Sequence, residues 1–421
     1  MTDSEARRAV EAVWRIEGAR LTASLARLVG DVSVADDLAQ DALVAALEQW
    51  PGSGIPEKPG AWLMGTAKHH AIDLLRRRQR LERKQAQLGR QLEIEQENVP
   101  DLEAAMDDQV GDSLLRLMFV ACHPVLSREA RVALTLRLLG GLTTDEIARA
   151  HLVPEPTVAQ RIVRAKRTLG EAHVPFEVPA GADLGARLSS VLEVIYLIFN
   201  EGYAATAGEH WIRLDLCQEA LRLGRILAEL APHEPEVHGL VALMELQASR
   251  LRARTTASGD PVLLLDQDRG RWDHLLIQRG LHGLARAETL GQTLGPYALQ
   301  ASIAACHARA RTAQETDWKQ ITALYDALVE VAPSPVVELN RAVALSMAYG
   351  PDAGLEVVES LLGEPSLRGY HLLPSVRGDL LFRLGRIDEA RAEFERAASL
   401  TKNVREREVL RERARSTRTG S

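Results

Sequence analysis

Residues 142–169 read LTTDEIARAHLVPEPTVAQRIVRAKRTL, two short amphipathic segments separated by a proline-containing turn. Thr143 and Glu146 have the spacing of a capping box, in which the hydroxyl accepts the N3 amide and the carboxylate reaches back to the capping residue. Pro156 is tolerated near the start of the second segment, because a first-turn amide has no intrahelical partner there. The stretch therefore predicts a helix–turn–helix pair, which requires a helical domain around it.

The second helix of this pair begins near Glu155 and has one apolar and one polar face. Four apolar side chains share one stripe and are expected to pack on the preceding helix: Val158, Ile162, Ala165 and Leu169. The side chains that then point outward or lie on the flank are Thr157, Gln160, Arg161, Arg164 and Lys166. Such a face can reach base edges and phosphates in a DNA groove. An ordinary core helix with an exposed polar face is the alternative.

Composition places the chain in the all-α class. Its 421 residues are only 4% aromatic, Ala, Leu, Arg and Glu dominate, and alternating strand-like runs are scarce. This length suggests two to four domains. The formal net charge of −7 excludes a polycation, so the charge of individual segments must determine any contact with nucleic acid.

Cysteines and hydropathy restrict the cellular setting. Cys122, Cys217 and Cys306 are far apart and show no CxxC spacing, so we expect neither a disulfide framework nor a zinc site. The start, MTDSEARRAVEAVWR, lacks the apolar core of a signal peptide. The longest apolar run, LSSVLEVIYLIF, is interrupted by Glu193 and is too short to span a bilayer. A cytoplasmic protein without a membrane segment is expected.

The first ninety residues pair an acidic helix with a basic one. VADDLAQDALVAALEQW carries four acids and no base. From Ala61 to Lys84 there are seven bases and two acids. His69 and His70 are adjacent and face different sides of the helix, which makes them poor zinc ligands but suits contacts with splayed bases. The contrast suggests two partners, a protein with a basic groove and a nucleic acid. The alternative for the acidic helix is a merely solvated face.

Breaks in the helical pattern divide the chain. Helical periodicity from about Ser4 to Trp50 ends in the loop PGSGIPEKPG, residues 51–60, and a second helix is expected over 61–87. Residues 93–112 hold eight acids and neither Lys nor Arg, which predicts an acidic linker. HVPFEVPAGADLG, residues 173–185, marks a boundary. The predicted division is a domain over 1–90, a linker over 91–112, and domains over 113–175 and 185–415.

The C-terminal half is predicted to consist of helical hairpins. In VRGDLLFRLGRIDEARAEFERA, small and large residues recur with the spacing of a tetratricopeptide hairpin, where small residues let two helices approach and an aromatic fills the gap: Gly378, Ala390, Phe394 and Ala397. A looser copy lies upstream, around Ala342. A generic helical bundle is the alternative. The basic tail from Lys402 to Ser421 is predicted to be a frayed, solvated helix.

One acidic pair raises the question of catalysis. Asp266 and Asp268, in LLLDQDRGRWD, form a DxD that could bind a metal. No phosphate-binding glycine loop accompanies them, and Arg269 and Arg271 can pair with them. No nucleophile–base constellation stands out elsewhere. We therefore expect no cofactor, no metal and no enzymatic activity.

Three stretches in order resemble the extracytoplasmic-function (ECF) sigma factors of bacterial RNA polymerase. They are ADDLAQDALVAALEQW, PGAWLMGTAKHHAIDLLRRR and, after the acidic linker, LRLLGGLTTDEIARAHLVPEPTVAQRIVRAKR. The resemblance covers roughly residues 5–172. It extends to nearly the whole chain through FVACHPVLS, YLIFNEGYAAT, LLLDQDRGRWD and GPYALQASIAACHARA, which look like blocks of a subgroup with a tetratricopeptide-like C-terminal extension.

The resemblance implies roles for individual residues. Asp37, Gln40 and Asp41 stand where the family binds the clamp helices of the polymerase β′ subunit. Residues expected at the −10 element, where the duplex opens, are Lys68, His69, His70, Arg76, Arg77 and Arg80. Those expected at the −35 element are Thr157, Gln160, Arg161, Arg164 and Lys166. Pro156 replaces a common Gly and Ala159 a common Lys, so one family contact at the −35 element is expected to be missing.

The resemblance also implies partners. They are core RNA polymerase, through its β′ clamp and β flap, and promoter DNA, with a small YCII-like protein as a further partner. The acidic linker would thread the polymerase channel that later carries RNA, and the C-terminal domain would modulate activity. Two other readings remain open: a helix–turn–helix regulator that acts without polymerase and senses a signal through its repeats, and a pure scaffold.

Overall fold

The structure, a computed structural model, describes residues 3–89, 110–151, 153–205, 207–208, 211–256 and 260–417. Helices α1 to α18, four short 3₁₀ turns and one pair of two-residue strands form the described part, so the predicted all-α class is confirmed. The chain divides into two compact units, Met1–Val194 and Ile195–Ser421. Most of the predicted acidic linker, residues 91–109, lies outside the described residues.

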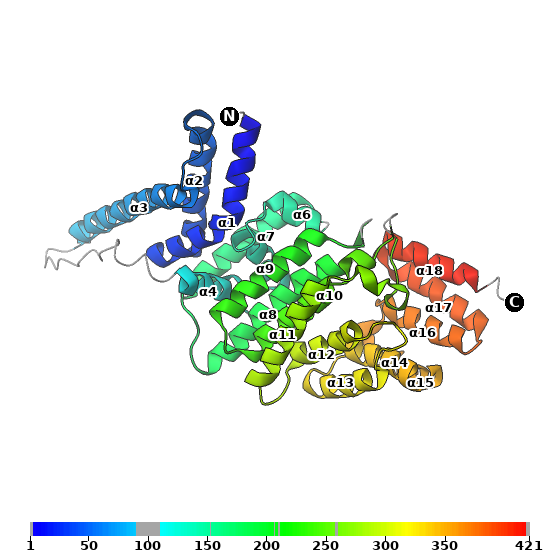
Figure 1. The fold of residues 1–421 in the computed structure, drawn as a ribbon. Helices are drawn as coiled ribbons and strands as arrows, with labels where there is room; N and C mark the ends of the chain where they lie inside the picture. Colours follow the sequence, from blue (N-terminus) through cyan, green and yellow to red (C-terminus); the bar gives the residue numbers. More distant parts are fainter. Residues whose placement is uncertain are drawn as a thin grey trace. The chain divides into compact units, whose positions relative to one another are not determined.

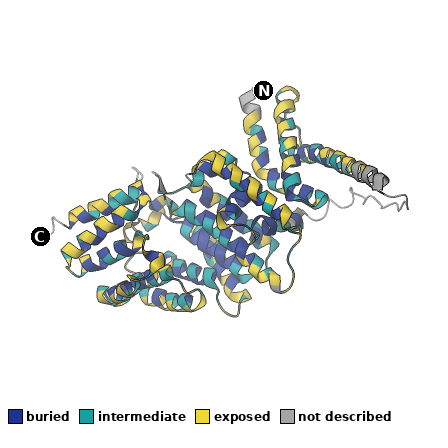
Figure 2. Cartoon of the chain, turned by 180° about the vertical axis from the view of Figure 1, so that it is seen from behind, coloured by how far each residue is buried: buried dark blue, intermediate teal, exposed yellow. Residues whose placement is uncertain are grey.

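The first unit consists of seven helices and the beginning of an eighth (Figure 1). Their bounds are α1 (Asp3–Val29), α2 (Val32–Ser53), α3 (Pro59–Gly89), α4 (Val110–Ala121), α5 (Arg128–Leu138), α6 (Thr144–His151), α7 (Glu155–Glu171) and α8 (Ala182–Tyr203). Contacts join α1, α2 and α3 into one bundle and α5, α6 and α7 into another, while α4 packs on both α1 and α5. Buried residues gather where these helices meet, and exposed ones follow their outer faces (Figure 2).

The predicted loop at residues 51–60 is present but shorter in the structure, and an earlier break interrupts the helix that was predicted from about Ser4 to Trp50. The first interruption comes at Gly30, whose φ of 71° ends α1, and at Asp31, whose carboxylate caps α2 by accepting the Ser33 and Val34 amides. Helix α2 then runs through Pro51 and ends only at Gly54, which has a φ of 83°. Glycine often ends a helix, because it has no Cβ and so adopts a positive φ without a steric clash. The loop is therefore shorter than predicted.

The predicted helix–turn–helix pair is present as α6 and α7. The capping box forms, with the Thr143 amide donating to Glu146 Oε2 at 2.8 Å and the Glu146 amide donating to Thr143 Oγ1 at 3.1 Å. The apolar stripe of α7 is buried along its whole length: Val158, Ile162, Ala165 and Leu169. The stripe fixes which face of α7 is left outward.

Thr143→Ala is expected to destabilise the start of α6 by about 1 kcal/mol, because the Glu146 amide loses its acceptor. The measurement is amide hydrogen exchange across residues 143–147, which should become faster. The control is Thr144→Ala, since the Thr144 hydroxyl makes no hydrogen bond among the described residues. Equal exchange in the two variants would contradict the capping role.

The second unit is a succession of helices that pack on their neighbours in chain order, as Figure 1 shows. After the second half of α8, the helices are α9 (Leu214–Leu230), α10 (Pro235–Ala248), α11 (His274–Leu290), α12 (Pro296–Arg309), α13 (Trp318–Val331), α14 (Pro335–Tyr349), α15 (Pro351–Leu361), α16 (Leu372–Arg383), α17 (Ile387–Leu400) and α18 (Val404–Ser416). The 3₁₀ turns are η1 (Leu251–Ala253), η2 (Leu264–Asp266), η3 (Arg269–Arg271) and η4 (Pro365–Leu367).

Helices α16 and α17 approach each other closely at Gly378, as the sequence of this hairpin predicts. A Cβ on Gly378 would lie 2.9 Å from the Phe394 ring, and Phe394 is fully buried together with Ala390 and Ala397. The small residue thus makes room for the aromatic one. The tetratricopeptide-like assignment of the whole tract stays a prediction.

The C-terminal tail is not the frayed, solvated helix that its charge predicts. Strand β2 (Lys402–Asn403) pairs in parallel with β1 (Ala207–Gly208), and the buried Asn403 donates its Nδ2 to the Ala205 carbonyl at 3.1 Å. Helix α18 then packs on α17 and buries Leu410 and Ala414. The last helix is therefore attached to the segment after α8, which makes it part of the second unit. In the described part of the chain, no helix combines the length and hydrophobicity of a membrane span.

Candidate nucleic-acid interface

Helix α2 presents the predicted acidic residues unequally. Asp37 and Asp41 are exposed, and 71% of the Asp37 side chain is accessible. Gln40 is half-buried because its amide donates to Asp36 Oδ2 at 2.7 Å. Asp36, which the sequence analysis did not single out, is 2% exposed. The exposed acids lie one helical turn apart, so the two charges share a face.

Helix α3 carries the predicted basic surface. Lys68 is half-buried, and the other predicted residues are exposed: His69, His70, Arg76, Arg77 and Arg80. Neither Lys68 nor any of the three arginines forms an ion pair with a carboxylate of the described residues. Their charge is therefore available to phosphates, which dominate binding to nucleic acid.

His69 is held in one orientation on this surface. Its Nδ1 lies 2.7 Å from the Gly65 carbonyl oxygen. Because a carbonyl only accepts, Nδ1 must carry the proton, and the neutral ring then leaves Nε2 as an acceptor. An exposed acceptor on a fixed ring can take a hydrogen bond from the amino group of an unpaired base.

The outward face of α7 borders a groove in the first unit. Thr157, Gln160 and Arg164 are exposed and Arg161 is half-buried. These four side chains line a cavity of about 460 Å³ together with residues before and at the start of α5: Val125, Leu126, Ser127, Glu129 and Ala130. Hydrogen bonds from its own amide and from Ser127 lower the pKa of Glu129, and the Arg161 guanidinium lowers it further. The groove thus combines cations with one ionised carboxylate.

Lys166 does not join this outward face. Its ammonium lies 2.5 Å from Asp36 Oδ2 and 3.5 Å from Asp37 Oδ1, and only 12% of the side chain is accessible. In this structure the residue expected at DNA therefore binds the acidic helix α2. Sequence periodicity placed Lys166 on the flank of the apolar stripe, but it gave no indication of this partner.

A second contact joins the N-terminal helices to the helix–turn–helix pair. Arg15 Nη2 lies 2.7 Å from Glu146 Oε1, the same carboxylate that caps α6. Beside it, the largely buried Trp14 packs near Gly141, where a Cβ would lie 3.6 Å from the ring. Burial raises the pKa of Glu146, but hydrogen bonds from Thr143 and the Arg15 guanidinium together outweigh it, so the pKa of this carboxyl is lowered. Two separate contacts thus hold α1 and α2 against α6 and α7.

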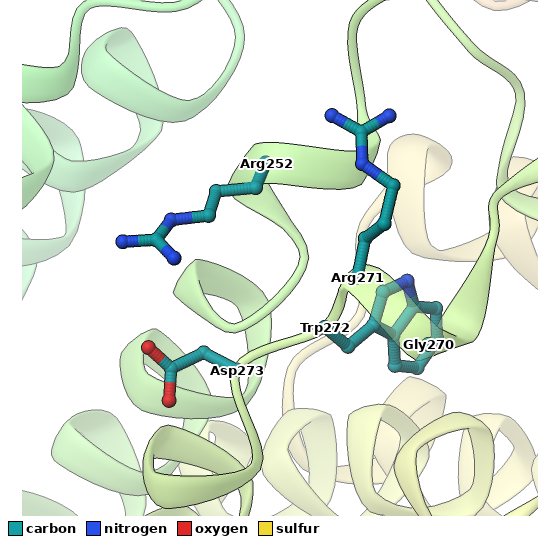
Figure 3. Close-up of a pocket in the computed structure, with 5 residues that line it drawn as sticks. All are labelled: Arg252, Gly270, Arg271, Trp272 and Asp273. Atoms are coloured by element: carbon teal, nitrogen blue, oxygen red, sulfur yellow. The ribbon is translucent and has the colours of Figure 1, made fainter.

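In the DxD pair of the second unit, Asp268 stabilises a turn. Asp268 Oδ1 accepts the Gly270 amide at 2.9 Å, and Arg269 donates to the His307 and Ala310 carbonyls instead of to a carboxylate. Asp273, in the neighbouring cavity of about 710 Å³, caps α11, and Figure 3 shows the Arg252 and Arg271 side chains extending apart. Within the described ranges, no three His, Cys, Asp or Glu side chains gather as metal ligands.

Three family models match the chain. They are Sigma-70 region 2 over residues 15–81, Sigma-70 region 4 over residues 116–169, and a family of unknown function, DUF6596, over residues 187–288. The first match falls within α1 to α3, and the second spans α4 to α7. The third begins inside α8 and ends in α11.

Two relatives agree with these matches. An uncharacterized protein of Rhizobium meliloti (strain 1021) is 43% identical over 92% of this chain and 91% of its own length. The ECF RNA polymerase sigma factor SigL of Mycobacterium tuberculosis is 30% identical over 145 residues, which are 34% of this chain and 76% of SigL.

Proposed function

The chain belongs to the ECF sigma factors, and we propose that it docks on core RNA polymerase through α2 and directs it to promoters by holding the −10 element on α3 and the −35 element on α7. Accordingly, α1 to α3 are called region 2 and α4 to α7 region 4. The sigma factors act by binding, and transcription initiation is the process they serve.

The exposed face of α2 is the observation that carries the docking proposal. Asp37 and Asp41 are followed at helical spacing by Val44 and Leu47, whose side chains are 51% and 38% exposed. Acids beside bare apolar side chains suit a protein partner with a basic groove, since apolar contact supplies affinity and charge supplies orientation. The β′ clamp is the proposed partner, and Gln40 would join this contact.

The proposed −10 contact rests on the free cations of α3. Opening a promoter unstacks bases at a cost of a few kcal/mol per step. Exposed arginines that bind phosphates offset this cost, and His69 and His70 can hold the unpaired bases. The residues proposed for this contact are Lys68, His69, His70, Arg76, Arg77 and Arg80.

The proposed −35 contact rests on the outward face of α7. Thr157, Gln160, Arg161 and Arg164 would lie toward the major groove, where the N-terminal part of a recognition helix meets base edges. Lys166 would add a phosphate contact only after leaving Asp36. Val125, 44% exposed near this groove, is an apolar side chain of region 4 that could meet the polymerase β flap.

We propose further that the second unit modulates this activity. Stacked helical hairpins commonly form binding surfaces for peptides and proteins. A small YCII-like protein is the partner suggested by the resemblance. The protein would act in the cytoplasm, where the polymerase is, with residues 91–112 as the tether between the two DNA-binding regions.

The test is capture of the purified full chain by core RNA polymerase, followed by transcription from a cognate promoter in vitro. A sigma factor should bind the core enzyme, select the start site, and show little affinity for promoter DNA alone. A regulator that acts without polymerase would instead bind a palindrome as a dimer. Tight binding to the target site without start-site selection would overturn the proposal.

A further inference from the structure

We infer that the free protein holds itself in a closed form, in which region 4 covers part of the polymerase-docking helix through the α2–α7 contact. This contact consists of Lys166 on α7 with Asp36 and Asp37 on α2, and within α2 Gln40 donates to the same oxygen of Asp36. The inference rests on the proposed function, because it concerns the residues proposed for polymerase and DNA. In the closed form, α2 keeps Lys166 away from DNA, and α7 keeps Asp37 partly occupied and away from polymerase.

The burial of the charges distinguishes this contact from a fortuitous surface ion pair. Side-chain accessibility is 12% for Lys166 and 3% for Asp36. Surface pairs contribute little because solvent screens them, whereas a buried pair that loses one partner leaves a charge without compensation. Asp36 also accepts the Gln40 amide, so two donors satisfy one carboxylate oxygen.

A second set of side chains supports the same closed form. Arg15 of α1 binds Glu146 of α6, more than a hundred residues away in sequence, and Trp14 is largely buried beside Gly141. The two contacts use different helices on each side, α1 with α6 and α2 with α7. Rotation about either contact alone is therefore opposed by the other.

In the contact, each proposed site binds a residue that the other site needs for its own ligand. Lys166 cannot neutralise a phosphate while its ammonium is bound to Asp36 and Asp37. Asp37 cannot give its whole charge to the clamp while the Lys166 ammonium lies 3.5 Å from its carboxylate. Binding of polymerase to α2 and of −35 DNA to α7 both favour the open form. By thermodynamic linkage, each ligand must then raise the affinity for the other.

Carbodiimide coupling of the free full-length protein tests the closed form directly. This reagent joins an ammonium to a carboxylate within contact distance, so digestion and mass spectrometry should find Lys166 linked to Asp36 or Asp37. Addition of core polymerase should remove the link. Absence of the link in the free chain would overturn the inference.

Asp36→Asn supplies the second measurement, because the amide keeps the size of the side chain but removes its charge. The rate at which a soluble acylating reagent modifies Lys166 should rise about tenfold, which corresponds to losing roughly one charged hydrogen bond. Promoter affinity of the free chain should rise with it. The matched control is Glu48→Gln, since Glu48 is an exposed acid of the same helix that forms no ion pair among the described residues.

The outcomes separate this inference from the proposed function. Equal acylation of Lys166 in the wild type, Asp36→Asn and Glu48→Gln proteins would show that the α2–α7 contact does not hold the free chain closed. Capture by core polymerase would still stand in that case. If the link forms but the chain is never captured, the closed form is real and the proposed function fails. Circular dichroism of Asp36→Asn confirms that the variant is folded.

Discussion

Replacing Asp37 and Asp41 together with arginine is expected to abolish capture by core RNA polymerase, with a loss of affinity of at least about 100-fold. Both acids are exposed on one face of α2, and the proposed partner surface is basic, so each substitution changes an attraction into a repulsion. The measurement is a pull-down with the core enzyme, followed by titration of the binding constant.

Whether the affinity for polymerase falls or rises is informative, because Asp37 also contacts Lys166. Asp37→Arg also removes a carboxylate from the α2–α7 contact, where it lies 3.5 Å from the Lys166 ammonium. A more open chain would bind polymerase more tightly, so a loss of capture can only come from the docking face itself. The control is Glu408→Arg with Glu412→Arg on α18, which changes the charge equally at two exposed acids four residues apart. Capture that survives the α2 substitutions would refute the assignment of this helix.

Arg161→Ala with Arg164→Ala is expected to lower transcription from a cognate promoter about 10- to 100-fold, because a good bidentate contact to a base contributes roughly 1–3 kcal/mol. The two arginines lie on the outward side of α7, and neither contributes to its buried stripe. If one of them binds a phosphate, the slope of log affinity against log salt should also fall by about 1.

The matched control for this pair is Arg167→Ala. Arg167 is exposed on the same helix, but its guanidinium binds Glu171 one turn along at 2.7 Å. Loss of Arg167 should leave transcription within about twofold, as expected for an exposed intrahelical pair. If the Arg161 and Arg164 double variant transcribes as well as the wild type, the alternative that the protein is a scaffold would be favoured.

Local pattern was sufficient to predict the helix–turn–helix pair. Its capping box and the stripe from Val158 to Leu169 depend on residues within one or two helical turns of each other, and both are present. The same holds for Gly378 and Phe394, whose spacing reflects one hairpin. Local arguments failed at Pro51, where the break was placed too early, since the left-handed Gly54 ends the helix.

The C-terminal tail shows a signal that was present but outweighed by charge. Leu410 and Ala414 lie four residues apart and are both buried against α17, although basic residues dominate the segment. Two apolar residues at helical spacing were enough for packing. The charged side chains lie around them, as in other surface helices that bury one narrow stripe.

The α2–α7 contact could not be predicted, because it joins residues 130 positions apart. A partial indication existed in the sequence: Asp36 comes four residues after Val32 and three before Ala39, both of which are buried. An acid on an otherwise apolar stripe requires a cation or a donor nearby. Which cation supplies the charge depends on tertiary packing alone.

Helix α8 continues without a break across the boundary between the two units, and this affects how the protein can be shortened. The first half of α8 makes polar contacts with region 4. Ser190 donates to the Cys122 carbonyl at 2.6 Å, and Glu193 pairs with Arg131 at 3.1 Å. A fragment ending near residue 180 would remove these partners from Arg131 on α5 and from the Cys122 carbonyl after α4. Poor activity of such a fragment would then reflect damage to region 4 and not the loss of the proposed regulatory unit, so a minimal version must end within α8, after Val194.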